Sequence, residues 1–418
     1  MQQSVEKPVK HTRALIVLTS LFFMWGLITS LNDILVPHLK AVFTLSYVQA
    51  SMIQFSFFTA YFIMSFPAGR LVERIGYKSG IIAGLLTAGV GCTLFYPAAS
   101  AHSYPFFLAA LFILASGITV LQVAANPYVN VLGDPATAAS RLNLTQAFNA
   151  LGTTVGPLVG SVTILAIGVG AASQLGDSSS AADSVKVPYL VLAALLGAIA
   201  VAIALFRLPT ISHQAPKDGI SKTNSIFAHR HLVLGVIGIF AYVGAEVSIG
   251  SYLVSLMGQP DIAGLSSHVA GKYLALYWSG AMIGRFIGSA LMQYIRPGRM
   301  LAFNAVVNTL LIAAAITLGG HIAMWALILM GLFNSIMFPT IFSLALEGLG
   351  SHTGKGSGLL CMGIVGGAIV PLVQGYFADN IGLLASFAVP MVCYLYIFFY
   401  GGWGSRVNTA ASHNKKAH

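Results

Sequence analysis

Long apolar runs recur along almost the whole chain, and each is close to the 20 or so residues that a helix needs to cross a bilayer. Membrane-spanning β-strands would instead alternate apolar and polar residues over segments of about ten. These runs are continuous, so we expect an all-α membrane protein with twelve transmembrane helices. The expected spans are residues 14–38, 47–69, 79–98, 105–131, 142–168, 187–207, 232–257, 268–292, 300–318, 322–346, 357–378 and 382–403.

The charges are few and unevenly placed. Hydrophobic residues make up 57% of the chain and charged residues 8%, whereas soluble domains carry about 25% charged residues. The net charge of +10 does not indicate a nucleic-acid partner, because 18 of the 21 Lys and Arg fall on one side of the expected spans, leaving Lys40, Lys186 and Lys272 on the other. The positive-inside rule therefore predicts that both termini lie in the cytoplasm. We expect a multi-pass protein of a bacterial inner membrane, surrounded by lipid.

The longest polar segment between expected spans divides them six and six. We expect an N-terminal half over 1–208, a cytoplasmic interdomain linker over 209–231 and a C-terminal half over 232–418.

Weak internal similarity supports two related halves. Gly69 and Arg70 recur as Gly284 and Arg285, 215 residues later, and prolines recur at nearly the same offset. This predicts two six-helix halves related by an axis along the membrane normal, as in the major facilitator fold. Small residues at every fourth position, Gly152, Gly156 and Gly160, predict close helix packing in the fifth span.

Only two acidic residues, Asp33 and Glu246, lie well inside expected spans. A carboxylate at such depth costs several kcal/mol unless it faces a watery cavity or is protonated. Desolvation raises the pKa of a carboxyl group, which can then take a proton from one side and release it to the other. Both are candidate proton-coupling residues, although Asp33 could be an interfacial carboxylate and Glu246 a buried structural acid.

Polar and aromatic side chains cluster in the same helices. Amides offer donors and acceptors together, which suits a ligand covered with hydroxyl groups, and aromatic faces suit the apolar side of a sugar ring. Interhelical hydrogen bonding is the alternative role for each amide. The candidate substrate-binding residues, together with Glu246, are Asn32, Gln54, Gln122, Asn126, Asn143, Gln146, Asn149, Tyr273, Tyr277, Trp278 and Asn334.

The segment GRLVERIGYK, residues 69–78, joins the second and third expected spans and is similar to the signature loop of the major facilitator superfamily. Flanking positive charge is the simpler interpretation. The resemblance implies an interdomain gate, to which we assign Glu73, Arg70, Arg74 and the second-half Arg285.

Further segments in both halves, including LNDILVPHLKAVFTL, RLNLTQAFNALG and FPTIFSLALEGLG, resemble the fucose permease family of sugar:proton symporters. AEVSIGSYL and LQVAANPYV are similar to its glucose/galactose branch. The resemblance implies that Asp33 is a protonation site. It also implies an acid in the fourth span, where this chain has Gln122. At the position of Glu246 it implies a glutamine instead of an acid.

We therefore expect secondary active import of a neutral hexose, such as glucose or galactose, by alternating access. Protons are the expected coupling ion, with sodium open because a carboxylate can also bind it. N-acetylglucosamine or fucose remains open as substrate, as does export of another solute. No enzymatic constellation such as HExxH is present, so we expect no enzyme activity, no cofactor and no metal site, and we expect a functional monomer.

Overall fold

The computed structural model describes residues 12–42, 47–101, 103–160, 186–209 and 226–407, without the side chains of residues 31–42, 47–51, 54 and 157–160. The chain forms two compact units. Met1–Ile211 and the short segment Arg285–Ala290 form the first unit, and Ser212–Gly284 with Leu291–His418 form the second. Most of the expected linker, residues 210–225, lies outside the described residues.

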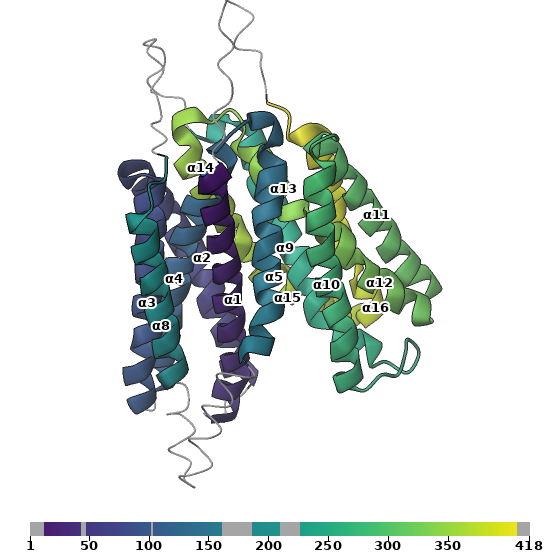
Figure 1. Cartoon of the computed structure of the whole chain (residues 1–418). Helices are drawn as coiled ribbons and strands as arrows, with labels where there is room; N and C mark the ends of the chain where they lie inside the picture. The colour runs from purple at the N-terminus through teal and green to yellow at the C-terminus, as the bar shows by residue number, and fades with distance from the viewer. Residues whose placement is uncertain (1–11, 43–46, 102, 161–185, 210–225, 408–418) are drawn as a thin grey trace, which may run out of the picture. The chain divides into compact units, whose positions relative to one another are not determined.

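The first unit is helical throughout its described residues. Inside it α3 packs against both α4 and α8 (Figure 1), and α1 packs against α5. Stacked rings of Phe95 and Tyr189, with centroids 3.7 Å apart, fill the contact between α3 and α8. The elements are α1 (Thr12–Val42), α2 (Tyr47–Ile75), α3 (Tyr77–Ser100), α4 (Tyr104–Val131), the 3-10 turn η1 (Pro135–Thr137), α5 (Ala138–Gly160) and α8 (Lys186–Leu205).

In the second unit α9 is the central helix, in contact with α13, α15 and α17. The main helices are α9 (Arg230–Met257), α10 (Ser267–Leu291), α11 (Pro297–Leu318), α12 (Gly320–Asn334), α13 (Met337–Leu346), α14 (Thr353–Met362), α15 (Gly366–Ile381), α16 (Leu383–Ser386) and α17 (Ala388–Phe399). Short turns complete it: η3 (Ile226–Ala228), η4 (Gly350–His352), η5 (Gly363–Val365) and the π-helical η6 (Tyr400–Gly404).

Three expected spans are interrupted rather than continuous. The span over 322–346 is broken between α12 and α13, because Pro339 has no amide to bond to the carbonyl of Ser335. The 3-10 turn η5 interrupts the span over 357–378, and a break after Ser386 divides the last one. The break between α12 and α13 begins directly after Asn334 and so lies at a predicted site residue.

Ten helical segments among the described residues are long and apolar enough to cross a membrane. Expected spans five and eight are missing from this set. The described part of the fifth, α5, ends at Gly160, and α10 carries Lys272 and Arg285. Both helices carry predicted substrate-binding residues, so polarity and candidate function coincide in them.

Glycines allow two close helix contacts at equivalent positions of the two units. A Cβ atom on Gly152 in α5 would collide with the backbone carbonyl of Phe23 in α1. A Cβ atom on Gly366 in α15, 214 residues after Gly152, would collide with the carbonyl of Phe240 in α9. Gly156 is similarly close to Ser30, so close packing is confirmed for Gly152 and Gly156.

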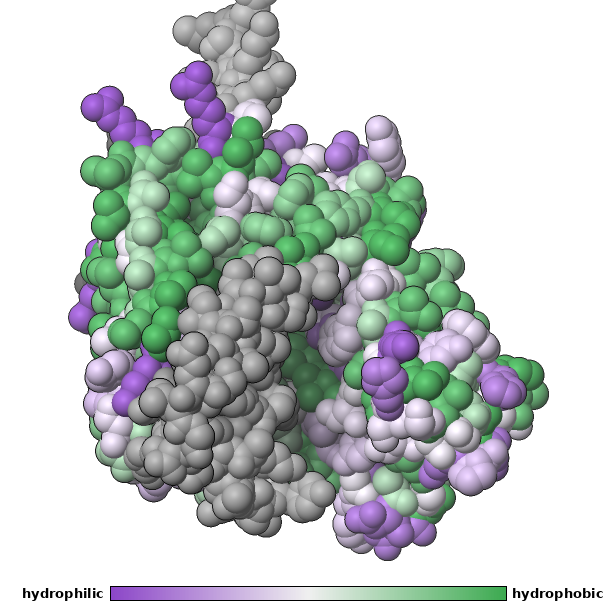
Figure 2. All heavy atoms as spheres, turned by 60° about the horizontal axis from the view of Figure 1, so that its bottom comes forward, coloured by the Kyte–Doolittle hydropathy of each residue, from purple (hydrophilic) through white to green (hydrophobic). Residues whose placement is uncertain are grey.

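Large apolar side chains remain exposed on the described helices, among them Leu205, Phe303, Leu310 and Leu372, each at least 61% exposed. In Figure 2 hydrophobic residues cover much of the visible helical surface, and hydrophilic residues gather toward the helix ends. A surface with this pattern suits surrounding lipid better than water.

Candidate functional site

In the first unit, α4 and α5 bring a group of amides together in its interior. Gln122 and Asn126 on α4 are 7% and 0% exposed, and Asn143 and Gln146 on α5 are 0% and 7% exposed. Nε2 of Gln146 donates to Oδ1 of Asn126 at 3.3 Å and links the two helices. The structure thus brings these four predicted residues onto facing helices, and we call Gln122, Asn126, Asn143 and Gln146 the amide cluster.

Two atoms of the amide cluster are buried with hydrogen-bonding capacity left over. Oε1 of Gln122 and Nδ2 of Asn126 have no hydrogen-bond partner among the described residues. Leaving a buried polar atom unpaired costs about 1–3 kcal/mol. The cluster can therefore both accept from and donate to a hydroxylated ligand without first breaking an internal bond at these atoms.

Asn149 has a more structural environment than its neighbours. Its Nδ2 donates to the backbone carbonyl of Phe22 at 2.9 Å and connects α5 to α1. The carbonyl of Asn149 is also the atom that a Cβ on Gly26 would strike. The side chain is only half-buried, and Oδ1 is the atom of its amide that this bond does not use.

Arg141 fixes the turn that aligns α4 with α5. Its Nη1 donates to the carbonyl of Asp134 (2.7 Å) and to Oγ1 of Thr137 (2.6 Å), and its Nη2 donates to the carbonyl of Asn130 (2.9 Å). The planar guanidinium suits such multiple bonding. Sequence reasoning counted Arg141 only as a positive flanking charge and missed this role.

In the second unit, Asn334 is the centre of a buried hydrogen-bond network. Its Nδ2 donates to the hydroxyl of Tyr277 (2.7 Å), while its Oδ1 accepts from Nδ2 of Asn308 (2.8 Å) and from the hydroxyl of Tyr394 (2.7 Å). All four side chains are fully buried. We call them the Asn334 network; it joins α10, α11, α12 and α17.

A glycine allows this network to form. A Cβ atom on Gly331, one turn before Asn334, would collide with the backbone carbonyl of Tyr277. Only the missing side chain lets α12 approach α10 closely enough for the bond from Asn334 to Tyr277. Sequence reasoning found Tyr277 and Asn334 but missed Asn308 and Tyr394, whose one sequence signal is a polar group within an apolar run.

Trp278 lies against Tyr277 and extends the network to a half-exposed aromatic surface. Their ring centroids are 5.0 Å apart and the rings are nearly perpendicular. The indole packs over Gly250 in α9, where a Cβ atom would lie 3.1 Å from Cζ2 of Trp278. Gly250 is one turn after Glu246 on α9, so Trp278 packs against α9 one turn away from the acid.

Tyr273 lies one turn before Tyr277 on α10 and stacks edge-on against Trp325, with centroids 5.7 Å apart. Glu246 is half-buried and lies on α9 one turn before Gly250, the residue that packs under Trp278. The structure therefore brings Glu246, Tyr277, Trp278 and Asn334 into one neighbourhood, and Tyr273 borders it.

Three predicted residues cannot be placed by their side chains. Asn32 and Asp33 belong to α1 and Gln54 to α2, but their side chains lie outside the described residues.

The loop between α2 and α3 turns at Gly76, whose φ of 81° favours glycine. Glu73 is half-buried, Arg74 is exposed, and Arg70 lies over the ring of Phe66 at 4.4 Å. Arg285, the remaining residue assigned to the gate, lies in α10.

Lys78, on the far side of the same loop, has an evident structural role. Its Nζ donates to the carbonyls of Ala204 (2.7 Å) and Phe206 (3.0 Å), at the end of α8. A cation is favourable at the negative end of a helix. Lys78, a basic residue of the segment GRLVERIGYK, thus connects α3 to the end of α8 inside the first unit.

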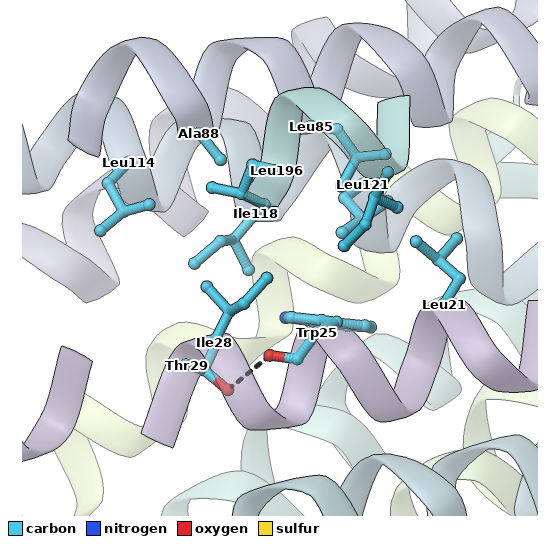
Figure 3. Close-up of a pocket in the computed structure, with 11 residues that line it drawn as sticks. Leu21, Trp25, Ile28, Thr29, Leu85, Ala88, Leu114, Ile118, Leu121 and Leu196 are labelled. Carbon is cyan, nitrogen blue, oxygen red and sulfur yellow. Dashed lines mark hydrogen bonds between the residues drawn. The ribbon is translucent and has the colours of Figure 1, made fainter. Parts of the chain in front are cut away.

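A separate pocket in the first unit is apolar (Figure 3). It is enclosed by α1, α3, α4 and α8, and the hydroxyl of Thr29 donates to the carbonyl of Trp25 at 3.0 Å, which leaves the indole N–H of Trp25 as its other polar group. Such a lining offers few partners to a ligand covered with hydroxyl groups, so we place the candidate site at the amide cluster instead. Among its lining residues are Leu21, Ile28, Leu114, Ile118 and Leu196.

The helical fold and the buried polar site can be compared with known protein families. The family model described as Major Facilitator Superfamily matches residues 15–364, so the chain belongs to this superfamily of transporters. It is a multi-pass membrane protein with the twelve-helix fold that the sequence predicted.

Similar proteins are known within the superfamily. A protein of Brucella abortus named "Glucose/galactose transporter" is 58% identical over 393 residues, which cover 94% of each chain. The "L-fucose-proton symporter" of Escherichia coli K12 is 36% identical over 427 residues, which cover 97% of each chain. A crystal structure titled as the E. coli fucose:proton symporter FucP matches 95% of this chain with a TM-score of 0.86 at 33% identity. The resemblance to fucose permease-like proteins, and to their glucose/galactose branch, is confirmed.

Proposed function

We propose that this protein imports a neutral hexose such as glucose or galactose by proton symport. The observation that carries the proposal is the amide cluster, which is uncharged and buried and has an acceptor on Gln122 and a donor on Asn126 without partners among the described residues. Sugar hydroxyl groups both donate and accept, so they can pair with both atoms. The similarity to transporters named for glucose, galactose and fucose supports a sugar as the ligand.

The two units contribute differently to recognition. In the first unit Gln122, Asn126 and Gln146 bind hydroxyl groups, and the nearby Asn143 and Asn149 border them. In the second unit Trp278 packs against the apolar face of the sugar ring, and Glu246 accepts from a hydroxyl group. Because the described bonds of Asn334 are all internal, its role is to position Tyr277 and Trp278.

Asp33 and Glu246 couple sugar movement to protons. Each carboxyl group is protonated from one side of the membrane and releases the proton to the other, which requires no cofactor. Gln122 cannot titrate, so the fourth-span acid that the resemblance implies is absent here, and Glu246 supplies the second carboxyl group.

The remaining assignments follow from the superfamily's alternating-access mechanism. The two halves span 1–208 and 232–418 with a linker over 209–231, both termini lie in the cytoplasm, and the protein works as a monomer surrounded by inner-membrane lipid. Glu73, Arg70, Arg74 and Arg285 close the cytoplasmic side.

Transport of radiolabelled sugars into vesicles tests the proposal. Glucose, galactose, fucose, mannose and N-acetylglucosamine would be offered with and without sodium, and with the pH gradient intact or collapsed. We expect uptake of glucose or galactose that needs no sodium, falls when the gradient collapses, and raises the external pH of unbuffered vesicles. Sodium-dependent uptake would show that sodium, not protons, is the coupling ion. Preferred uptake of another sugar would change the proposed substrate. Uptake that rises when the pH gradient is collapsed would indicate an exporter.

A further inference from the structure

Asn130 is the least explained polar residue in the described part of the first unit. Its side chain is 8% exposed, and both its Nδ2 and its Oδ1 are buried without a hydrogen-bond partner among the described residues. Two unpaired atoms on one buried amide are costly, at about 1–3 kcal/mol each.

The backbone carbonyl of Asn130 has a hydrogen-bond partner that does not depend on the side chain. Nη2 of Arg141 donates to the backbone carbonyl of Asn130 at 2.9 Å, and this bond would form with any residue at the position. Arg141 therefore explains where Asn130 lies but not why its side chain is an amide.

Position on the helix connects Asn130 to the sugar site. Gln122, Asn126 and Asn130 are spaced by four residues on α4, so they lie on one face and span about 12 Å along the helix axis. Each has at least one buried atom without a partner among the described residues. On α5, which returns from the turn beside α4, Asn143 is one turn closer to the turn than Gln146. The amide-bearing surfaces of both helices thus continue from the Asn126–Gln146 bond toward the turn.

We propose that Asn130 extends the sugar-binding face of α4 by one turn and bonds to a sugar hydroxyl as the sugar moves from the amide cluster toward the α4–α5 turn. This inference rests on the proposed hexose transport. The contact forms during passage rather than at first binding, so it accelerates translocation and changes the affinity for external sugar little. Water alone is the competing partner, since it would satisfy the same two atoms.

The test compares Asn130→Ala and Asn130→Ser with the wild type in proteoliposomes, using glucose and a set of monodeoxy glucose analogues. We expect Asn130→Ala to lower the maximal exchange rate of glucose about tenfold, with KM changed less than about twofold, and Asn130→Ser to restore part of the rate. Thr119→Val is the matched control on the same helix, because within the described part of the chain the Thr119 hydroxyl donates to the carbonyl of Ala115 in its own helix.

The analogues decide between sugar and water. If Asn130 bonds a sugar hydroxyl, one monodeoxy analogue lacks that hydroxyl. The wild type should exchange this analogue as slowly as Asn130→Ala exchanges glucose, and Asn130→Ala should exchange it no more slowly than the wild type does. A slowing by the same factor for every analogue, or a glucose rate within about twofold of the wild type, overturns the inference. A wild type that exchanges no hexose would instead refute the proposed function, so the two failures are distinguishable.

Discussion

The amide cluster of the first unit and the Asn334 network of the second both bury amides, yet their central amides differ in how far their bonds are satisfied, although Oδ1 of Asn308 in the network also has no partner among the described residues. Asn334 uses both of its polar atoms on three neighbouring side chains of its own unit. In the amide cluster, Gln122 and Asn126 each keep an atom with no partner among the described residues.

This difference indicates a division of labour. A buried amide with both polar atoms bonded, such as Asn334, rigidifies its surroundings, whereas a partly bonded one is costly unless a ligand completes it. We therefore expect the amide cluster of the first unit to supply hydrogen bonds to the sugar, and Tyr277 and Trp278 of the second unit to supply a fixed aromatic surface. Substitutions in the two regions should fail in different ways.

The largest effect is expected from Asn126→Leu. This change removes the free donor and also deprives Gln146 of its partner, so we expect the rate of sugar uptake at low concentration to fall about 100-fold, by roughly tenfold for each bond lost. Initial rates of radiolabelled uptake, normalised to protein in the membrane, measure it. Thr119→Val should remain within about twofold, and an equally active Asn126→Leu would remove the amide cluster from the site.

A smaller effect on transport, but a larger one on stability, is expected from Asn334→Leu. It breaks three buried bonds at once, so the unfolding free energy should fall by about 2 kcal/mol and KM should rise about tenfold. Thermal unfolding in detergent and uptake kinetics measure the two quantities. Asn304→Leu, which loses one bond to the carbonyl of Phe333, is the control, and an unchanged melting temperature in Asn334→Leu would contradict a supporting network.

The smallest effect is expected from Tyr394→Phe. The change removes one hydroxyl that donates to Asn334 and leaves the bond to Tyr277 in place, so we expect KM to rise about threefold with kcat unchanged. Tyr396→Phe is the control on the same helix, α17. It loses a bond to the carbonyl of Leu234 on α9 and should leave KM unaltered. A loss of kcat in Tyr394→Phe would instead place Tyr394 among the groups that act during translocation.

Helix positions were predictable from the sequence because span length and hydropathy are properties of the segment itself. Helix breaks could not be predicted in this way, as two prolines 212 residues apart, Pro127 and Pro339, show. Pro127 lies inside the continuous helix α4, whereas Pro339 lies just after the break between α12 and α13. Whether a helix tolerates a missing amide depends on how neighbouring helices satisfy the freed carbonyl, and that is a tertiary property.

The types of residue in the candidate site were also predictable, since amides in apolar runs are costly and so stand out. Their roles were not. Asn126 and Asn334 are both deep amides in equivalent helices, and only their partners distinguish an open ligand group from a positioning one. Arg141 and Lys78 were missed because the sorting of basic residues by side already accounted for their charge, while their hydrogen bonds depend on the fold.

In the proposed mechanism the uncharged amides of the first unit bind the sugar while Asp33 couples its movement to protons, and Asp33→Asn tests this separation most directly. The measurement compares uphill uptake of glucose or galactose under an inward pH gradient with equilibrium exchange of the same sugar in the same vesicles. The account predicts that Asp33→Asn abolishes accumulation while exchange stays measurable, because the amide cluster is intact. Undiminished accumulation by Asp33→Asn would contradict it.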